Sequence, residues 1–185
     1  MNPLYPNAAE LKVLKSFQST DEARTNLCTI WIYNSDGGCT HMATNGHVIV
    51  VRRSGTHCEK LLVDIGNLPA NAERSSLATT VPPRSWASFI KAPNCEGKNL
   101  LVRGIDPAYV GMIANVERVA GRRAALDYVP IQGESKKDVA EERRRLIDTA
   151  ISRWSIGCGE DDGWYWSMFV GTVCWEGVIM PRRIR

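Results

Sequence analysis

Apolar residues recur along this chain with two different periods, and each period predicts one kind of element. Near the N-terminus, every third residue over 11–17 is apolar, and Asn7 stands where it can cap a helix. This spacing predicts an amphipathic helix over residues 8–19. Lys12 and Lys15 fall outside its apolar face.

Runs of β-branched and aromatic residues predict strands in the region that follows. Residues 28–33 form one such run, a turn rich in Asn, Asp and Gly follows at 34–38, and residues 39–42 begin a returning strand. The turn signal at 44–46 and the valine-rich run at 48–51 predict a further strand. Together these features predict a hairpin that continues into a third strand.

Weaker patterns predict the elements in the middle of the chain. Residues 61–65 and 100–102 are short apolar runs typical of strands, and residues 109–119 alternate loosely enough to supply one or two more. Two prolines open a short helix over residues 84–91. Residues 4–130 are therefore predicted to contain two units, each with a helix and antiparallel strands.

The last third of the chain predicts a linker, a helix and a hairpin. Residues 133–140 are polar, as in a linker, and residues 139–154 have the period of a long helix. Residues 164–171 and 172–180 predict the two strands of a hairpin. The helix is expected to bury one stripe, formed by Ala140, Leu146, Ile147, Ala150, Ile151 and Trp154.

This order of elements indicates an α+β fold, with helices packed on one face of an antiparallel sheet. The length of 185 residues allows one domain or one and a half. The net charge of +3 is mild, so only a local basic face would point to a nucleic acid. No apolar run is long enough to span a membrane and the N-terminus lacks the pattern of an export signal, so a cytoplasmic protein is expected.

The six cysteines form no C-x-x-C pair, and they are expected to be free thiols in a reducing compartment. Cys39 with His41, and His57 with Cys58, have spacings that match no common zinc module, so no metal site is predicted. No G-x-S-x-G, P-loop or H-E-x-x-H motif is present, so no catalytic residue or cofactor is predicted. The protein is therefore not expected to be an enzyme.

Three separated stretches resemble the bacterial β sliding clamp, the ring that tethers DNA polymerase III to DNA. Residues 43–47, Ala-Thr-Asn-Gly-His, resemble the clamp's Ala-Thr-Asp-Gly-His, with Asn45 in place of Asp and Val48 in place of the following Arg. Residues 126–130, Leu-Asp-Tyr-Val-Pro, resemble a Phe-Pro-Asp-Tyr stretch that is followed by an apolar residue and Pro. Residues 178–183, Val-Ile-Met-Pro-Arg-Arg, resemble the clamp's C-terminal Val-Val-Met-Pro-Met-Arg.

The resemblance implies a clamp-like module over residues 1–132 and a helix-and-hairpin remnant over residues 133–185, packed on that module. A clamp protomer has three modules, so a chain with one module needs several copies to encircle DNA, and a homo-oligomer is expected. Unpaired strand edges favour the same expectation. So do the tryptophans of a hairpin that little sequence remains to cover, Trp164, Trp166 and Trp175.

In the clamp family the three stretches surround an apolar cleft that takes short peptides from polymerases and repair proteins. The resemblance therefore implies a groove in which His47 and Met180 lie close together. Aliphatic and methionine side chains suit apolar peptide anchors, although Val50 and Ile179 fit a core better. The implied cleft residues are Thr44, Gly46, His47, Val48, Ile49, Val129, Val178, Met180 and Arg183.

Two functions follow from the resemblance. One is a DNA-replication accessory protein that binds duplex DNA as an oligomer, through attraction to phosphates, and recruits replication proteins. The other is a peptide-binding module that has lost the ring and competes for, or regulates, the partners of a clamp. The residues implied in DNA contact, for which a solvated surface is the alternative, are Lys12, Lys15, Arg84, Lys91, Arg143 and Arg144.

Overall fold

The computed structural model describes residues 6–24, 27–35, 38–55, 77–78, 105–156 and 163–180. Several sequence predictions fall outside these ranges. They are the strands at 61–65 and 100–102, the helix at 84–91, and the candidate site residues Arg84, Lys91 and Arg183.

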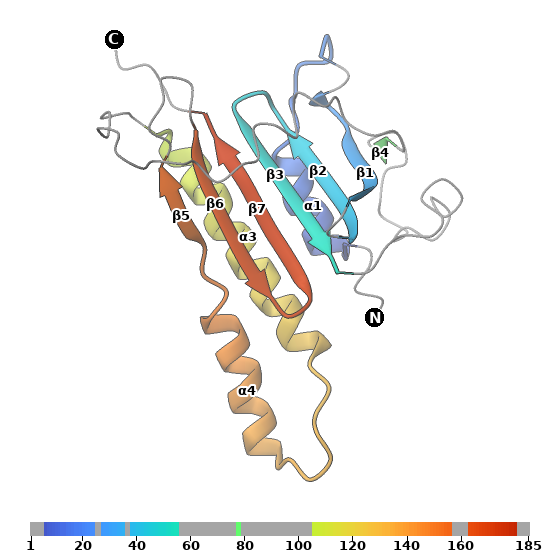
Figure 1. Ribbon diagram of the computed structural model, residues 1–185, viewed down its shortest axis with the longest axis vertical. Coiled ribbons are helices and arrows are strands. Elements are labelled where there is room, and N and C mark those ends of the chain that lie inside the picture. Colours follow the sequence, from blue (N-terminus) through green and yellow to red (C-terminus); the bar gives the residue numbers. More distant parts are fainter. Residues whose placement is uncertain are drawn as a thin grey trace.

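Within those ranges the chain forms three helices and a seven-stranded sheet (Figure 1). The helices are α1 (Ala8–Ser16), α3 (Pro107–Asp127) and α4 (Lys136–Asp148). The strands are β1 (Ile30–Ser35), β2 (Gly38–Thr44), β3 (Val48–Ser54), β4 (Leu77–Ala78), β5 (Arg153–Ile156), β6 (Trp164–Val170) and β7 (Val173–Ile179).

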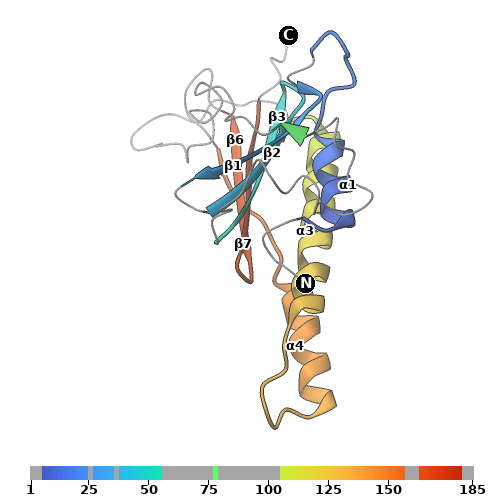
Figure 2. The same cartoon turned by 90° about the vertical axis from the view of Figure 1, so that its right-hand side faces the viewer.

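The strands lie in the order β4-β1-β2-β3-β7-β6-β5. Every neighbouring pair is antiparallel except β1 with the two-residue strand β4, which is parallel. Helices α1 and α3 lie side by side on one face of this sheet (Figure 2). The predicted α+β class, with helices packed on one face of an antiparallel sheet, is confirmed at this level.

The sheet consists of two halves with the same plan. A helix precedes three antiparallel strands in each half: α1 comes before β1, β2 and β3, and the pair α3 and α4 comes before β5, β6 and β7. The third strands of the two halves, β3 and β7, pair with each other between the halves. The described residues therefore contain two units of helix and strands, but the second is built from residues 107–179. The second unit predicted within residues 4–130, with its helix at 84–91, falls largely outside the described ranges. Residue 132, the predicted domain boundary, lies between α3 and α4.

The strongest strand signals of the sequence are confirmed. The β-branched and aromatic run at 28–33 contributes β1, the returning strand at 39–42 lies in β2, and the valine-rich run at 48–51 lies in β3. The hairpin predicted over residues 164–180 is β6 and β7. These segments combine strand-forming residues with turn residues between them, so local signals are sufficient to locate them.

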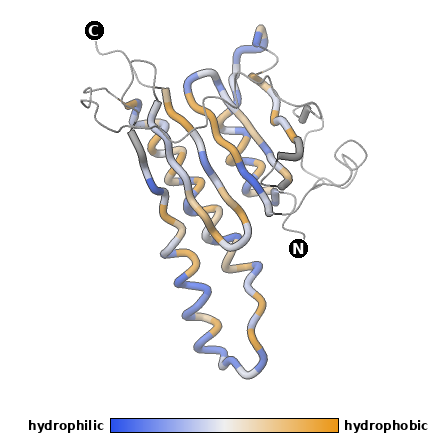
Figure 3. Tube along the Cα trace, in the orientation of Figure 1, coloured by the Kyte–Doolittle hydropathy of each residue, from blue (hydrophilic) through white to orange (hydrophobic). Residues whose placement is uncertain are grey.

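The main core lies between the sheet and the helices. Val48 and Val50 of β3 face this core, where they join Trp166 of β6, Trp175 of β7 and Val116 of α3. Apolar residues follow the strands and α3, whereas α4 is largely hydrophilic (Figure 3). Trp166 and Trp175 are fully buried within the chain, so they give no reason to expect an oligomer.

Helix α1 begins where the sequence predicts. The Asn7 side chain accepts a hydrogen bond from the Glu10 N–H at 2.9 Å, and the Glu10 carboxylate accepts one from the Asn7 N–H at 2.8 Å. This reciprocal arrangement is a capping box, which satisfies two N–H groups that the helix leaves unpaired. The helix ends at Ser16, earlier than predicted.

Residues 109–119 are part of α3, so the prediction of strands there is wrong. Asp106 caps the helix and Pro107 follows it at the first turn, a combination typical of a helix start. Three- and four-residue spacing places the buried residues of this segment on one helix face, and they are Ile113, Val116 and Ala120. β-branched residues favour strands locally, but packing of this face on the sheet overrides that preference.

The helix predicted over residues 139–154 is displaced towards the N-terminus. A capping box at Ser135 starts α4 within the predicted linker, and the helix ends at Asp148. Helix α4 has no buried residue and extends past the sheet beside the end of α3 (Figure 1). Among the described elements, α4 packs mainly on α3, and most of the predicted stripe is exposed. The exposed residues are Ala140, Ile147, Ile151 and Trp154, the last of which lies in β5.

Candidate functional site

The turn between β2 and β3 holds the His47 backbone against the end of β7. The Asn45 side-chain oxygen accepts hydrogen bonds from the N–H groups of His47 at 2.9 Å and Val48 at 3.1 Å. Gly46 has a φ of +90°, which favours glycine. The Met180 N–H donates to the His47 carbonyl at 2.8 Å. His47 and Met180 are therefore adjacent, as the clamp resemblance implies.

The predicted walls do not form a groove between His47 and Met180. Val48 faces the helix-covered core, whereas Val178 is buried on the opposite face of the sheet. Successive side chains of a strand point to opposite faces, so these two residues cannot line one groove. Val129 lies at the other end of the sheet, beside the β6–β7 turn.

The remaining cleft residues divide between core and surface. Thr44 and Ile49 are cross-strand partners, and both are buried on the face that carries Val178. Gly46 and His47 are exposed, and Met180 is half-buried. Of the implied cleft residues in the described ranges, only these last three reach the surface at this end of the sheet.

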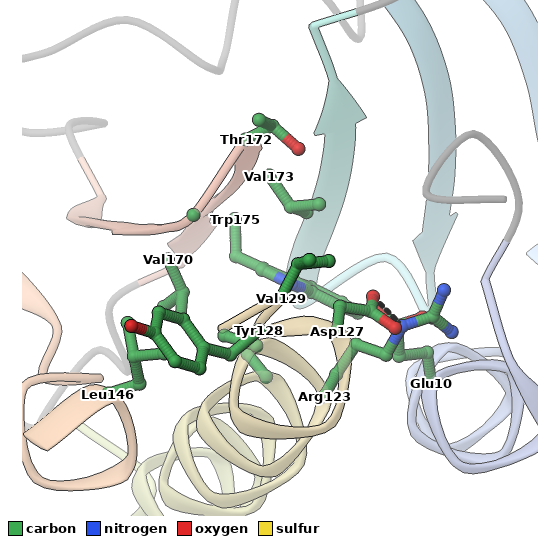
Figure 4. A pocket seen from close by; sticks show the side chains of 13 residues that line it. Glu10, Arg123, Asp127, Tyr128, Val129, Leu146, Val170, Thr172, Val173 and Trp175 are labelled. Carbon is green, nitrogen blue, oxygen red and sulfur yellow. Dashed lines mark hydrogen bonds and ion pairs between the residues drawn. The ribbon is translucent and has the colours of Figure 1, made fainter. Parts of the chain in front are cut away.

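A pocket of about 470 Å³ opens at the β6–β7 turn (Figure 4). It lies between the C-terminal part of α3, the loop after α3 and the ends of β6 and β7, with Leu146 of α4 and Glu10 of α1 in its wall. Its lining is mostly apolar, and its volume lies within the roughly 300–1,000 Å³ that ligand pockets occupy. Sequence reasoning missed this pocket, except for Val129.

A buried network of charges forms one wall of the pocket. The Arg52 Nε donates to Glu10 Oε1 at 3.0 Å, and the Arg123 Nη1 lies 3.6 Å from Glu10 Oε2. Arg123 also donates to Asp127. Burial lowers the pKa of Arg52, and the Glu10 carboxylate opposes that shift. Asp127, at 29% exposure, is the member of this network that reaches solvent.

The loop after α3 is fixed by Glu134. Its carboxylate accepts hydrogen bonds from the Tyr128 hydroxyl, at 2.7 and 2.8 Å, and from the Ile131 N–H at 2.9 Å. The hydrogen bond to Glu134 is the main cause that raises the pKa of Tyr128 to about 12. At neutral pH Tyr128 is therefore a neutral hydrogen-bond donor at the pocket wall.

A second polar cluster lies on the helix-free face of the sheet. The Arg53 Nη1 lies 2.5 Å from Glu176 Oε1, and the Tyr165 hydroxyl donates to Glu176 Oε2 at 3.0 Å. Burial, and then the Glu176 charge, raise the pKa of Cys174 to about 11 and that of Tyr165 to about 12. Both groups are protonated at neutral pH, so the Cys174 thiol is a poor nucleophile.

The outer surface of the helix layer carries basic side chains. Lys12 of α1 and Arg118 and Arg122 of α3 are exposed there. Glu117 of α3, next to Arg118 in the chain, accepts a hydrogen bond from the Ser152 N–H at 2.7 Å. Sequence reasoning missed both arginines because it predicted strands over residues 109–119, which contain Arg118, and no helix at Arg122. Their four-residue spacing is the signal that a helical prediction would have used.

The other residues implied in DNA contact lie in less favourable surroundings. Lys15 is half-buried, whereas Arg143 and Arg144 are exposed on α4. Arg144, at 84% exposure, lies 3.6 Å from Asp148. Helix α4 interleaves acidic and basic residues throughout, which weakens its attraction for phosphate.

The cysteine prediction needs a correction. Cys39 is disulfide-bonded, whereas Cys28 and Cys174 are free. The expectation of free thiols is therefore wrong for Cys39, because the fold rather than sequence spacing decides which thiols come within bonding distance. In the part of the chain that the structure describes, no three His, Cys, Asp or Glu side chains gather as a metal site, and each helix is too short or too polar to cross a bilayer.

The buried imidazole of His41 predicts a pH dependence of stability. Burial on β2, and then the charge of Arg52, lower the pKa of His41 from 6.5 to about 3. The unfolded chain therefore takes up a proton below pH ~6.5 that the folded protein excludes. We expect the free energy of unfolding to fall as the pH drops from ~6.5 towards 5, with a slope that rises from about 0.7 kcal/mol per unit at pH ~6.5 to about 1.4 kcal/mol per unit near pH ~5. Urea denaturation across this pH range measures how steeply the free energy of unfolding depends on pH. His41→Gln should remove the contribution of His41 to that dependence. An unchanged dependence in this variant would contradict the role of His41.

No protein-family model matches this chain, and no curated protein or solved structure is significantly similar to it.

Proposed function

We propose that this protein is a sliding-clamp-like accessory protein of DNA replication, which lies on duplex DNA through the outer surface of α1 and α3. One observation carries the proposal: two halves of the same plan meet at β3 and β7, and their helices share one face that exposes Lys12, Arg118 and Arg122. The three clamp-like stretches of the sequence support it independently.

The chemistry of this surface suits phosphate groups. Lysine and arginine side chains on a helix layer attract the DNA backbone without reading base edges, and a sliding contact requires that independence from sequence. Two nearby carboxylates offset the attraction only in part. Glu10 is buried and paired with Arg52, whereas Glu117, which accepts a hydrogen bond from the Ser152 N–H, keeps its negative charge next to Arg118 in the chain.

Association with DNA by this route favours an oligomer. A single sheet with one helix layer can cover only one side of a duplex, so encirclement needs several copies in a closed symmetric arrangement. Strand β5 ends the described sheet and offers an edge to a second copy.

Reversing the charge of the helix surface is the direct test. We expect Arg118→Glu combined with Arg122→Glu to weaken binding to duplex DNA by at least about tenfold at ~0.1 M salt, because two phosphate contacts are lost. The slope of log K against log salt should become shallower by ~0.9 for each lost contact. Fluorescence anisotropy with a labelled duplex, together with the mass in solution, measures both quantities.

Arg153→Glu is the matched control for this experiment. Arg153 is exposed on β5 opposite Ser167, so its side chain projects from the face of the sheet that α3 does not cover. This variant should bind DNA like the unaltered protein. Equal weakening by all three charge reversals would indicate general attraction and would count against the proposed surface.

A second candidate function is a peptide-binding module that has lost DNA encirclement. The hydrogen bond between Met180 and His47 favours it, because two stretches that line the peptide cleft in the clamp family are adjacent here. A monomeric mass, no salt-dependent DNA binding and retained binding of an apolar peptide would select this function over the first.

A further inference from the structure

We propose that the pocket at the β6–β7 turn binds a short segment of a partner protein, which inserts a large apolar side chain and places a lysine or arginine beside Asp127. This site lies at the other end of the sheet from His47 and Met180. It does not depend on the association with DNA proposed above.

Small residues of α3 leave room in the pocket for a large apolar side chain of the partner. Ala120 and Ala124 line the pocket from the helix, and Val170 and Val173 line it from β6 and β7. The methyl groups of the two alanines leave the volume of about 470 Å³ between helix and sheet. An aromatic or branched aliphatic side chain fits such a space and is the kind of group that an apolar pocket binds.

The charge around the pocket favours a basic residue in the partner. In the described part of the chain, the cations of the charge network at the pocket wall are buried, whereas one of its carboxylates reaches solvent. Glu10 is held between Arg52 and Arg123 inside the network. Arg123 pairs with Asp127 but is itself buried, so the charge that a partner meets at this wall is the partly exposed carboxylate of Asp127. A cation in the partner is attracted to this edge.

The surroundings of the pocket indicate a protein rather than a small molecule. Val129 at its rim is 79% exposed, and Leu126 and Ile131 on either side are 68% and 70% exposed. A small ligand inside the pocket leaves these apolar side chains in water. A polypeptide that crosses the rim covers them, as expected for a protein interaction site.

A pair of matched variants of the full chain tests the site. The probes are labelled synthetic peptides with a single Trp-Lys pair flanked by Gly and Ser, and the same peptides with Glu in place of Lys. We expect Val129→Glu to weaken binding of the Trp-Lys peptide by at least about tenfold in fluorescence anisotropy. Phe169→Glu places the same charge on a similarly exposed residue, at 75% exposure, whose side chain lies on the opposite face of the sheet, and it should change binding by less than about twofold.

The preference of the pocket for a basic residue is tested by comparing the affinities of the two peptides. The unaltered protein should bind the Lys peptide more tightly than the Glu peptide, and Asp127→Asn should remove most of that difference. Thermal melts establish that each variant is folded. Absence of peptide binding by the unaltered protein, or equal weakening by Val129→Glu and Phe169→Glu, would overturn the proposal. Duplex DNA binding should be unchanged in Val129→Glu, which separates this site from the helix surface.

Discussion

Replacing Arg52 with alanine is expected to lower the free energy of unfolding by about 3–5 kcal/mol. Arg52 is fully buried, and its Nε donates to Glu10 Oε1 at 3.0 Å. Without it, the Glu10 carboxylate keeps the more distant Arg123, at 3.6 Å, and the capping N–H of Asn7. The loss arises mainly because a charged carboxylate remains buried with too little compensation. Urea denaturation at neutral pH measures it.

Two comparisons separate this cause from a general effect of removing arginine. Arg144→Ala removes an exposed partner of Asp148 and should cost less than about 1 kcal/mol, because surface ion pairs contribute little. Arg52→Met combined with Glu10→Gln removes both buried charges and keeps a side chain at the helix cap. The double variant should lose much less than Arg52→Ala. A loss below about 1 kcal/mol in Arg52→Ala would show that the buried pair matters little.

Gly177→Ala is expected to cost at least about 3 kcal/mol, although it adds only one methyl group. Gly177 lies in β7 between β3 and β6. A Cβ at this position overlaps the Ile49 carbonyl oxygen and lies 2.7 Å from the Trp166 Nε1. The first neighbour is backbone of an adjacent strand, and the second is a fully buried side chain. Neither can retreat without opening the sheet or the core, so the strands must separate.

Gly111→Ala is the matched control, because the same methyl group there meets no atom within 4 Å. Gly111 lies on the exposed side of α3, and alanine should stabilise the helix by up to about 1 kcal/mol. The two substitutions are therefore expected to have opposite signs in the same denaturation experiment. Retention of full stability by Gly177→Ala would contradict the close approach of β3 and β7.

The clamp resemblance predicted one feature of the site that the structure bears out. It placed His47 beside Met180, and the two backbones are hydrogen-bonded. It did not predict which side chains reach the surface, because that depends on strand register. Val48 pairs with Ile179, so Val178 points to the other face.

The large pocket could not be predicted from any single stretch. Its lining combines Glu10 of α1 with residues of α3, α4 and the β6–β7 turn. The sequence contains no repeat or motif that links these segments. They meet because α3 crosses the ends of β6 and β7, an arrangement that depends on recognising residues 109–119 as helix.

The sequence by itself determined the elements whose signals are local. The capping box at Asn7 and Glu10, the turn around Gly46 and the hairpin of β6 and β7 each depend on residues close together in the chain. Such signals act through backbone preferences and neighbouring side chains, so they keep the same meaning in any fold.

Only the tertiary structure decided the identity of α3, the pairing of β3 with β7 and the burial of Arg52. Residues 109–119 contain β-branched residues that suit a strand, and they form a helix because one helical face packs on the sheet. An arginine such as Arg52 is normally expected at the surface. It is buried here because Glu10, which is 42 residues away in the chain, forms an ion pair with it inside the core. In each case the deciding free energy comes from contacts between distant segments, which local patterns do not encode.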